Sequence, residues 1–182
     1  AGAHGRTCEG NTVMRRFTTA IRAATVAALA LASGEAVAAD AMARLHDTAG
    51  RNVGQVLLSE TPHGTLLHLT LRDMPAGTHA FHVHETGACL PPFISAGGHF
   101  NPTDVGHGLM DDDGMHAGDM PNIHVPPASV LEQEVLNTAL ALDDALFDAD
   151  GAAIVIHAGA DDYATNPAGA AGARIACGVI TR

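Results

Sequence analysis

The sequence predicts an all-β domain, a sandwich or a barrel. Two observations support this prediction: the apolar segments after residue 40 are short, and turn residues separate them. Hydrophobic residues make up 47% of the 182-residue chain, although Trp is absent and Tyr occurs once. We therefore expect one domain whose core consists mainly of Val, Ile, Leu and Ala.

Six segments are expected to be strands, because each is an apolar run bounded by turn residues. They cover residues 53–59, 65–71, 79–85, 135–142, 152–157 and 174–180. Pro62 and Gly64 mark the first turn, and Pro75 and Gly77 mark the second. Residues 131–141 also have the composition of a helix, and this alternative stays open.

Two segments are long and rich in turn residues. Residues 86–122 are rich in Gly, Pro, Asp and His, and residues 158–173 are heavy in Gly and Ala. A structureless loop as long as the first is uncommon in a compact domain and is usually functional. We therefore expect two long functional loops.

Residues 14–39 have the features of a secretory signal peptide. Residues 14–16 give a basic start, residues 23–32 are apolar, and residues 36–38 supply the small-residue cleavage pattern. The alternative is an amphipathic or membrane-anchoring helix, but about ten apolar residues fall short of the about 20 that span a bilayer. We expect cleavage between Ala38 and Asp40 and a periplasmic or secreted domain at residues 40–182. Residues 1–13 show no interpretable pattern.

The charge balance excludes two classes of partner. Nine arginines and no lysine stand against twenty acidic residues, for a formal charge of −11. Without residues 1–39, five arginines remain against eighteen acidic residues, for a charge of −13. Such a surface repels nucleic acid and anionic membranes. A homodimer remains open, because the sequence does not decide the number of chains.

Export changes the interpretation of the three cysteines, because an oxidising compartment permits a stable disulfide. Cys8 lies upstream of the predicted signal, which leaves Cys89 and Cys177 as a pair. Two unrelated buried thiols are the alternative.

The histidines indicate metal chemistry. On a strand the side chains alternate between faces, so Phe81 and Val83 can enter the core while His82 and His84 project together from the other face. Alone, this pair could equally be two solvent-facing histidines. Further candidate ligands follow, however: His99, His107, His116, Asp119 and His157.

The types of ligand suggest two different ions. Neutral imidazole suits both copper and zinc, whereas a carboxylate among three histidines is compatible with tetrahedral zinc. One set of four histidines and another of three histidines and an aspartate would account for seven side chains if one histidine is shared. A shared imidazole can bind one ion through each ring nitrogen.

The sequence resembles the copper/zinc superoxide dismutase family, in its bacterial periplasmic form. The matching motifs are Phe81-His82-Val83-His84-Glu85, then Gly98-His99-Phe100-Asn101-Pro102, the spaced His107, His116 and Asp119, then Ile156-His157, Asp161-Asp162 and the segment 172–180. The resemblance spans about residues 53–180. It implies a Greek-key β-sandwich or flattened barrel of about eight antiparallel strands.

The resemblance also implies roles for these residues. The copper ion would be held by His82, His84, His99 and His157, and the zinc ion by His99, His107, His116 and Asp119. Asp161 would link a copper histidine to a zinc histidine, and Cys89 and Cys177 would form the family's disulfide. Arg174 and His99 would be catalytic, the first by guiding the superoxide anion and the second by bridging the ions.

The implied reaction converts superoxide to dioxygen and hydrogen peroxide by alternate reduction and reoxidation of copper. Two rivals keep the same fold, a periplasmic copper/zinc buffer and a metallochaperone. Storage needs neither Arg174 nor Asp161, so both residues favour the enzyme. Ala80 departs from the family, because Gly is common before Phe81 and His82.

Overall fold

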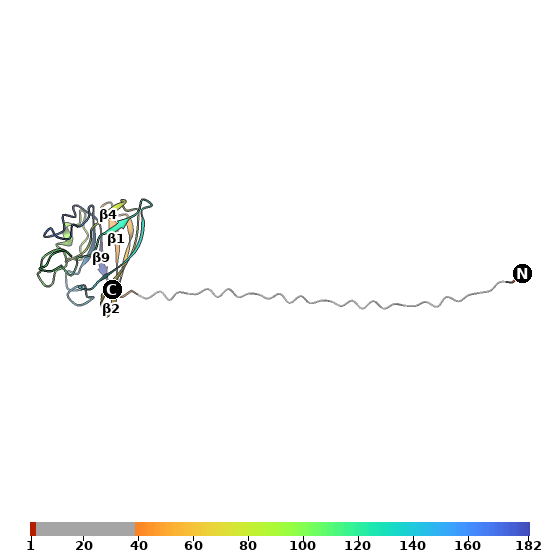
Figure 1. The fold of residues 1–182 in the computed structure, drawn as a ribbon, viewed down its shortest axis with the longest axis horizontal. Helices are drawn as coiled ribbons and strands as arrows, with labels where there is room; N and C mark the ends of the chain where they lie inside the picture. Colours follow the sequence, from red (N-terminus) through yellow and green to blue (C-terminus); the bar gives the residue numbers. More distant parts are fainter. Residues whose placement is uncertain (3–38) are drawn as a thin grey trace. The chain divides into compact units, whose positions relative to one another are not determined.

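The computed structural model describes residues 1–2 and 39–182, so the predicted signal peptide, apart from Ala39, and Cys8 lie outside the described residues. Within this part of the chain the structure has nine strands and one short 3-10 helix (Figure 1). They are β1 Ala41–Asp47, β2 Asn52–Thr61, β3 Gly64–Arg72, β4 Gly77–His79, β5 Phe81–His84, η1 Ile94–Ala96, β6 Ile123–Val125, β7 Val130–Asn137, β8 Ala153–His157 and β9 Arg174–Thr181. No helix in the described ranges has the length and hydropathy of a membrane span.

Seven of the strands form one antiparallel sheet in the order β5-β8-β9-β1-β2-β3-β7, and β4 pairs with β6. Several neighbours in this order are distant in the sequence, such as β3 and β7 or β9 and β1, as in Greek-key folds. The sheet curls around the core (Figure 1). The predicted all-β class is therefore confirmed.

Alternating side chains build the core inside this curl. On β3, Leu67, Leu69 and Leu71 are buried, while the residues between them are more exposed. Phe81 and Val83 of β5 belong to the same core cluster. As expected, small and aliphatic residues dominate this cluster, which contains two buried Phe and no buried Tyr among the described residues.

Three predicted elements differ from the structure. The strand expected at 79–85 is interrupted at Ala80, whose N–H donates to the Gly159 carbonyl (2.7 Å) and whose carbonyl accepts from His157 N–H (2.9 Å). The strand expected at 135–142 runs from Val130 to Asn137 instead. It ends there because the Asn137 side chain accepts the N–H groups of the next turn.

The helix considered for residues 131–141 is wrong, because residues 131–137 pair with β3 in a continuous register. The strands β1 and β6 escaped prediction. The buried face of β1 carries Ala41, Ala43 and Leu45, a weak apolar signal, and β6 has only three residues.

The outer face of β5 and β8 is covered by the first long loop. Phe93 and Ala96 of this loop form a second apolar cluster with Ala153, Val155 and Cys177. Cys89 is disulfide-bonded to Cys177, as predicted, with 5.6 Å between the Cα atoms. The disulfide fastens the loop to β9 at the edge of this cluster.

Candidate metal centre

The candidate ligands meet because the first long loop pairs with the open edge of β5. The Val83 N–H donates to the Gly118 carbonyl (3.0 Å), and the Val83 carbonyl accepts from Phe100 N–H (2.8 Å). His84 and His99 form an isolated antiparallel bridge. Backbone pairing of this kind aligns the loop residues with His82 and His84 on the strand.

Four histidines lie together on the outer face of the sheet, and we call them the four-histidine cluster: His82, His84, His99 and His157. One ring nitrogen from each lies within 4.8 Å of those of the others, and all four residues are buried. The pairing of β5 with β8 contributes to this meeting, because it puts His157 beside Ala80 and the two strand histidines.

The second group, the aspartate cluster, consists of His99, His107, His116 and Asp119. Its ligand atoms also lie within 4.8 Å of one another. Asp119 Oδ1 lies 2.7 Å from His99 Nδ1 and 3.2 Å from His116 Nδ1. Its other oxygen accepts the backbone N–H groups of Gly108 and His116, at 3.0 Å each. The carboxylate is therefore fixed by the loop itself.

His99 belongs to both clusters. Its Nδ1 faces Asp119, and its Nε2 is buried without a hydrogen-bond partner among the described residues. Its ring centre lies 4.0 Å from that of His82 and 5.1 Å from that of His107. The two ring nitrogens of His99 are therefore in different surroundings: Nδ1 faces Asp119 of the aspartate cluster, and Nε2 has no hydrogen-bond partner among the described residues.

Asp161 connects the clusters a second time from the second long loop. Its carboxylate is buried, with Oδ2 2.6 Å from His82 Nε2 and Oδ1 3.1 Å from His107 Nε2. Because both contacts use Nε2, the Nδ1 atoms of His82 and His107 are directed away from Asp161. Carboxylates that contact the remote nitrogen of a ligand histidine fix its tautomer and ring orientation.

Arg174 lies at the start of β9, beside the four-histidine cluster. Its guanidinium donates to the carbonyls of Phe93 (2.7 Å) and Gly97 (2.6 Å). His84 Nδ1 lies 3.1 Å from the same Gly97 carbonyl. Arg174 and His157 also line one open surface pocket with residues of the second loop. The positively charged guanidinium of Arg174 therefore lies in the wall of a pocket that also contacts His157 of the four-histidine cluster.

Unpaired nitrogens provide a test of whether these residues fit metal ions. His82 Nδ1, His99 Nε2 and His107 Nδ1 are buried without a hydrogen-bond partner among the described residues. His84 Nε2 and His157 Nε2 face each other at 3.4 Å, although only one hydrogen bond can join them. Buried polar atoms are normally paired, so these converging nitrogens fit cations better than a polar core.

The clusters also hold their ligands in the protonation states that metal binding needs. Burial lowers the pKa of His82 to about 4, of His84 to about 2 and of His157 to about 3, so these rings stay neutral. Burial would raise the pKa of Asp161, but hydrogen bonds from His82, the Tyr163 N–H and His107 lower it to about 2. Neutral imidazoles are the forms that bind metal, and an ionised Asp161 is the form that accepts hydrogen bonds from His82 and His107.

Comparison with known proteins agrees with this geometry. The family model for copper/zinc superoxide dismutase matches residues 52–180, which include both clusters, Asp161 and Arg174. The chain belongs to this family. The predicted resemblance is thereby confirmed.

Similar members of the copper/zinc superoxide dismutase family occur in several bacteria. The chain is 47% identical to superoxide dismutase [Cu-Zn] 2 of Aquifex aeolicus over 146 residues, which cover 77% of this chain and 85% of the relative. It is 45% identical to superoxide dismutase [Cu-Zn] of Caulobacter vibrioides, over 72% and 79% of the two chains.

Solved structures give the same family fold. A SOD-like protein from Bacillus subtilis is 36% identical, with a TM-score of 0.72 over 76% of this chain and 96% of that one. The Cu/Zn superoxide dismutase from Brucella abortus is 28% identical, with a TM-score of 0.68 over 78% of this chain and 100% of that one.

Three residues that support this superoxide dismutase site escaped the sequence analysis. The Asn122 side chain donates to the Asp161 carbonyl (2.9 Å) and accepts its N–H (2.8 Å), and Asn137 donates to the carbonyl of Asp119 (3.2 Å). Gly169 lies against Asp161 and His107 with no room for a side chain. No sequence signal separates these residues from ordinary loop asparagines and glycines, because their partners are distant in the sequence.

Proposed function

We propose that this protein is a copper/zinc superoxide dismutase that converts two superoxide anions and two protons to dioxygen and hydrogen peroxide. The observation that carries the proposal is the meeting of seven ligand side chains in two groups that share His99. The contacts of Asp161 and the position of Arg174 add to it. The family names of the bacterial relatives support the same activity.

We assign one copper ion to His82, His84, His99 and His157, and one zinc ion to His99, His107, His116 and Asp119. When bound, copper would supply the one-electron couple and zinc a fixed positive charge. Four imidazoles suit copper, and the carboxylate suits zinc.

The chain's own groups would then orient the reactants and move the protons. Asp161 would hold His82 and His107 through their Nε2 atoms. His99 Nε2 would hold and deliver a proton, because it is the buried nitrogen without a partner while Nδ1 faces Asp119. The Arg174 guanidinium would attract the superoxide anion into the pocket that it shares with His157.

The direct test measures superoxide decay by pulse radiolysis, using purified residues 40–182 with the disulfide formed and both metals loaded. We expect catalysis that depends on bound copper. The zinc-only protein is the control, since it keeps the fold without a redox-active ion. A fully loaded protein that leaves the decay rate unchanged would refute the proposal.

A copper/zinc buffer or a metallochaperone of the same fold is the second candidate. Either would bind metal through the same histidines without needing the guanidinium beside them. Both are disfavoured here because Arg174 is fixed by two hydrogen bonds next to the four-histidine cluster. An undiminished dismutation rate in Arg174→Ala would remove this residue from the mechanism, whereas metal binding without any dismutation would favour a buffer or a metallochaperone.

Two opposing charge effects act on the approaching anion. The formal charge of −13 for residues 40–182 repels superoxide over long distances, while Arg174 attracts it over the final approach. Raising the ionic strength from about 0.01 to 0.15 M shortens the screening length from roughly 30 to about 8 Å. We expect a parent rate that changes little or rises slightly with salt, and a loss of about tenfold or more in Arg174→Ala. A steep fall with salt would contradict this assignment.

We also propose that residues 14–39 are a signal peptide and that the mature domain, residues 40–182, acts in the periplasm or outside the cell. The Cys89–Cys177 disulfide supports an oxidising compartment. The intact mass of the exported protein tests both ideas. A retained Cys8 would refute the cleavage, and two free thiols would refute the compartment.

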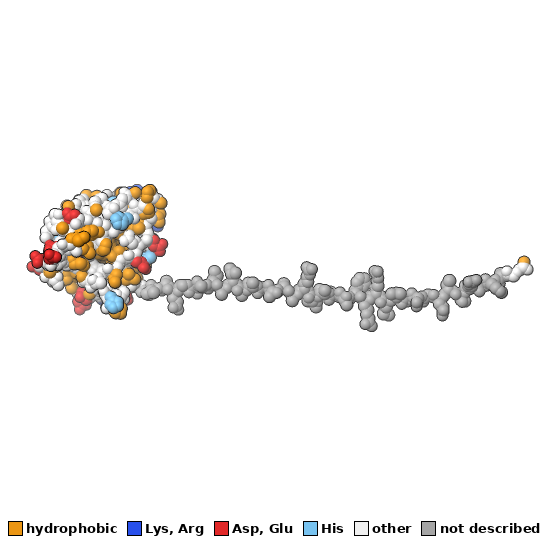
Figure 2. Space-filling view, in the orientation of Figure 1, with side chains coloured by type: hydrophobic (Ala, Val, Ile, Leu, Met, Phe, Trp, Pro, Cys, Tyr) orange, Lys and Arg blue, Asp and Glu red, His pale blue; other side chains and the backbone are white. Residues whose placement is uncertain are grey.

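For partners, we propose a homodimer with no binding to nucleic acid or membranes after cleavage. The excess of acidic residues supports the absence of nucleic-acid and membrane binding, and Figure 2 shows several groups of acidic side chains near the edge of the domain. Leu90 and Ile94 support a homodimer, since these apolar side chains, in the loop that begins at the disulfide residue Cys89, are 71% and 72% exposed. Sedimentation of the parent and of Leu90→Glu tests the dimer, which the charge should disrupt.

A further inference from the structure

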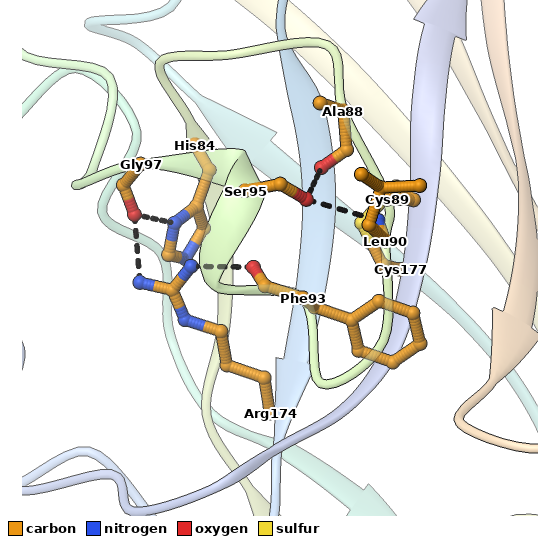
Figure 3. The surroundings of a disulfide bond; sticks show 9 residues. All are labelled: His84, Ala88, Cys89, Leu90, Phe93, Ser95, Gly97, Arg174 and Cys177. Atoms are coloured by element: carbon orange, nitrogen blue, oxygen red, sulfur yellow. Dashed lines mark hydrogen bonds between the residues drawn. A yellow bond between two sulfur atoms is a disulfide. The ribbon is translucent and has the colours of Figure 1, made fainter.

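The position of Arg174 depends on a short piece of the first loop. Both acceptors of its guanidinium, the carbonyls of Phe93 and Gly97, belong to the segment between Cys89 and Gly98 (Figure 3). Because the Gly97 carbonyl also lies 3.1 Å from His84 Nδ1, the same segment sets the place of Arg174 relative to the four-histidine cluster.

Phe93 is buried, although the other residues at positions 90–94 are exposed. It is 1% exposed, whereas Leu90 on one side and Ile94 on the other are more than 70% exposed. Its ring packs in the second apolar cluster with Ala153 and Val155 of β8. Figure 3 shows the ring directed away from Arg174, on the side of the disulfide, while the carbonyl is directed toward the guanidinium.

The backbone of Phe93 also needs the ring to stay in place. Its φ of 70° lies in the left-handed region, which is unfavourable for a residue with a side chain. Burial of the large ring compensates for this cost. This conformation begins helix η1 and aims the Phe93 carbonyl outward, so that it accepts from Ala96 N–H (3.2 Å) and from Arg174.

The Phe93 N–H also donates to the Leu90 carbonyl (2.6 Å), whereas the side-chain contacts that hold the segment act at other residues. The disulfide holds Cys89, and the Ser95 hydroxyl accepts from Leu90 N–H (2.9 Å) and donates to the Ala88 carbonyl (2.8 Å). Neither contact fixes the direction of the Phe93 carbonyl.

We infer that Phe93 is a positioning residue for Arg174: its buried ring sets the carbonyl that holds the guanidinium beside the four-histidine cluster. The consequence for superoxide rests on the proposed function, since Arg174 matters to the reaction only if it guides the anion. The placement of Arg174 does not depend on that activity.

The first test measures the labelling of each arginine by phenylglyoxal in the metal-free mature protein with the disulfide intact, followed by peptide mapping. In Phe93→Ala we expect Arg174 to react roughly 3- to 10-fold faster, the change expected from weakening one charge-assisted hydrogen bond. The exposed Arg51 serves as an internal reference and should not change.

Phe147→Ala is the matched control. It also removes a phenyl ring from a loop, but that ring is partly buried against the main core and packs on Arg182, with 4.1 Å from Cζ to the ring centre. General loss of stability would raise Arg174 labelling in both variants, whereas the inferred role raises it only in Phe93→Ala. Phe93→Leu keeps most of the buried volume and should restore slow labelling, which also covers a failure of Phe93→Ala to fold.

The second test titrates azide into the copper- and zinc-loaded proteins and follows the copper absorption. We expect weaker azide binding in Phe93→Ala than in Phe147→Ala, with an unchanged copper spectrum before azide. Parent-like labelling of Arg174 in Phe93→Ala would overturn the inference. Faster labelling in a protein whose parent does not dismutate superoxide would instead support the positioning role and remove the proposed function.

Discussion

The four-histidine cluster and the aspartate cluster share His99 but are held together differently. In the aspartate cluster the carboxylate of Asp119 lies within 3.2 Å of a ring nitrogen of all three histidines and accepts two backbone N–H groups. The four-histidine cluster has no carboxylate of its own among its members. Apart from the contact of the shared His99 with Asp119, the described residues give this cluster one contact with a carboxylate, that of His82 with Asp161.

This difference shows how the fold prepares two sites for different ions. Burial would raise the pKa of Asp119, but the hydrogen bonds from His99 and Gly108 N–H outweigh burial and lower it, so an anion is already in place. In the four-histidine cluster, burial keeps neutral rings close together with few partners. One cluster therefore offers negative charge and the other offers neutral nitrogen donors.

The largest expected effect comes from the residue that joins the clusters. His99→Ala should remove a ligand from both ions and a proton carrier, with a loss of dismutation of roughly 10²- to 10⁴-fold. His116→Ala is the comparison, because it touches the aspartate cluster alone. Metal analysis and the copper spectrum, recorded with and without zinc, accompany the rates.

In the parent, two ions per chain and a copper spectrum that responds to zinc are expected. In His99→Ala the copper spectrum should no longer respond to zinc. A parent that binds a single ion at saturation, or whose copper spectrum ignores zinc removal, would show that the two clusters do not share a ligand.

An intermediate effect is expected from the second link between the clusters. A Cβ on Gly169 would collide with the Asp161 carboxylate and lie 2.8 Å from His107 Nε2. Gly169→Ala should therefore weaken metal binding by about 10- to 100-fold, the range seen when such outer partners are lost. Competition with a chromophoric chelator measures both affinities.

Gly172→Ala is the matched control for this substitution. Gly172 lies in the same loop and has a positive φ of 78°, near the 62° of Gly169, but no atom lies within 4 Å of its added Cβ. Both variants carry similar backbone strain, so only the collision differs. Equal losses of metal affinity would mean that the Asp161 link does not matter.

The smallest effect concerns acid stability of the metal-free protein. Unfolded histidines have a pKa near 6.5, whereas His82, His84 and His157 are held at about 4, 2 and 3 in the folded chain. The unfolded chain therefore binds more protons, and stability falls as the pH decreases below about 6.5, by up to about 1.4 kcal/mol per pH unit for each histidine.

Asp161 affects the stability over a lower pH range than the histidines do. Asp161 has a folded pKa of about 2 against 3.8 for a free aspartate, so its contribution is lost only as the pH falls from about 4 to 2. Urea unfolding between pH 7 and 4.5 isolates the histidines. His84→Gln should flatten the pH dependence and the exposed His63→Gln should not; a stability that is constant over this range would contradict the assignment.

Sequence patterns predicted most of the sheet but misplaced some of its ends. The strands around Leu57 and Leu69 follow from short apolar runs bounded by turn residues, which are a local property of the sequence. The end of β7 depends on Asn137, whose side chain contacts the following turn and also the Ala117 and Asp119 carbonyls. Contacts between distant segments have no local signal, so these boundaries were not predictable.

The sequence by itself determined the chemistry available: seven donors of the right types, a strand that places His82 and His84 on one face, and two cysteines that can pair. Only the tertiary structure decided which nitrogen of each ring is left free, because Asp161 and Asp119 approach from other segments. Only the tertiary structure brings the Phe93 carbonyl to the Arg174 guanidinium, from which it accepts a hydrogen bond. Hydrogen-bond direction and burial depend on packing over the whole domain, whereas residue type and strand periodicity are local.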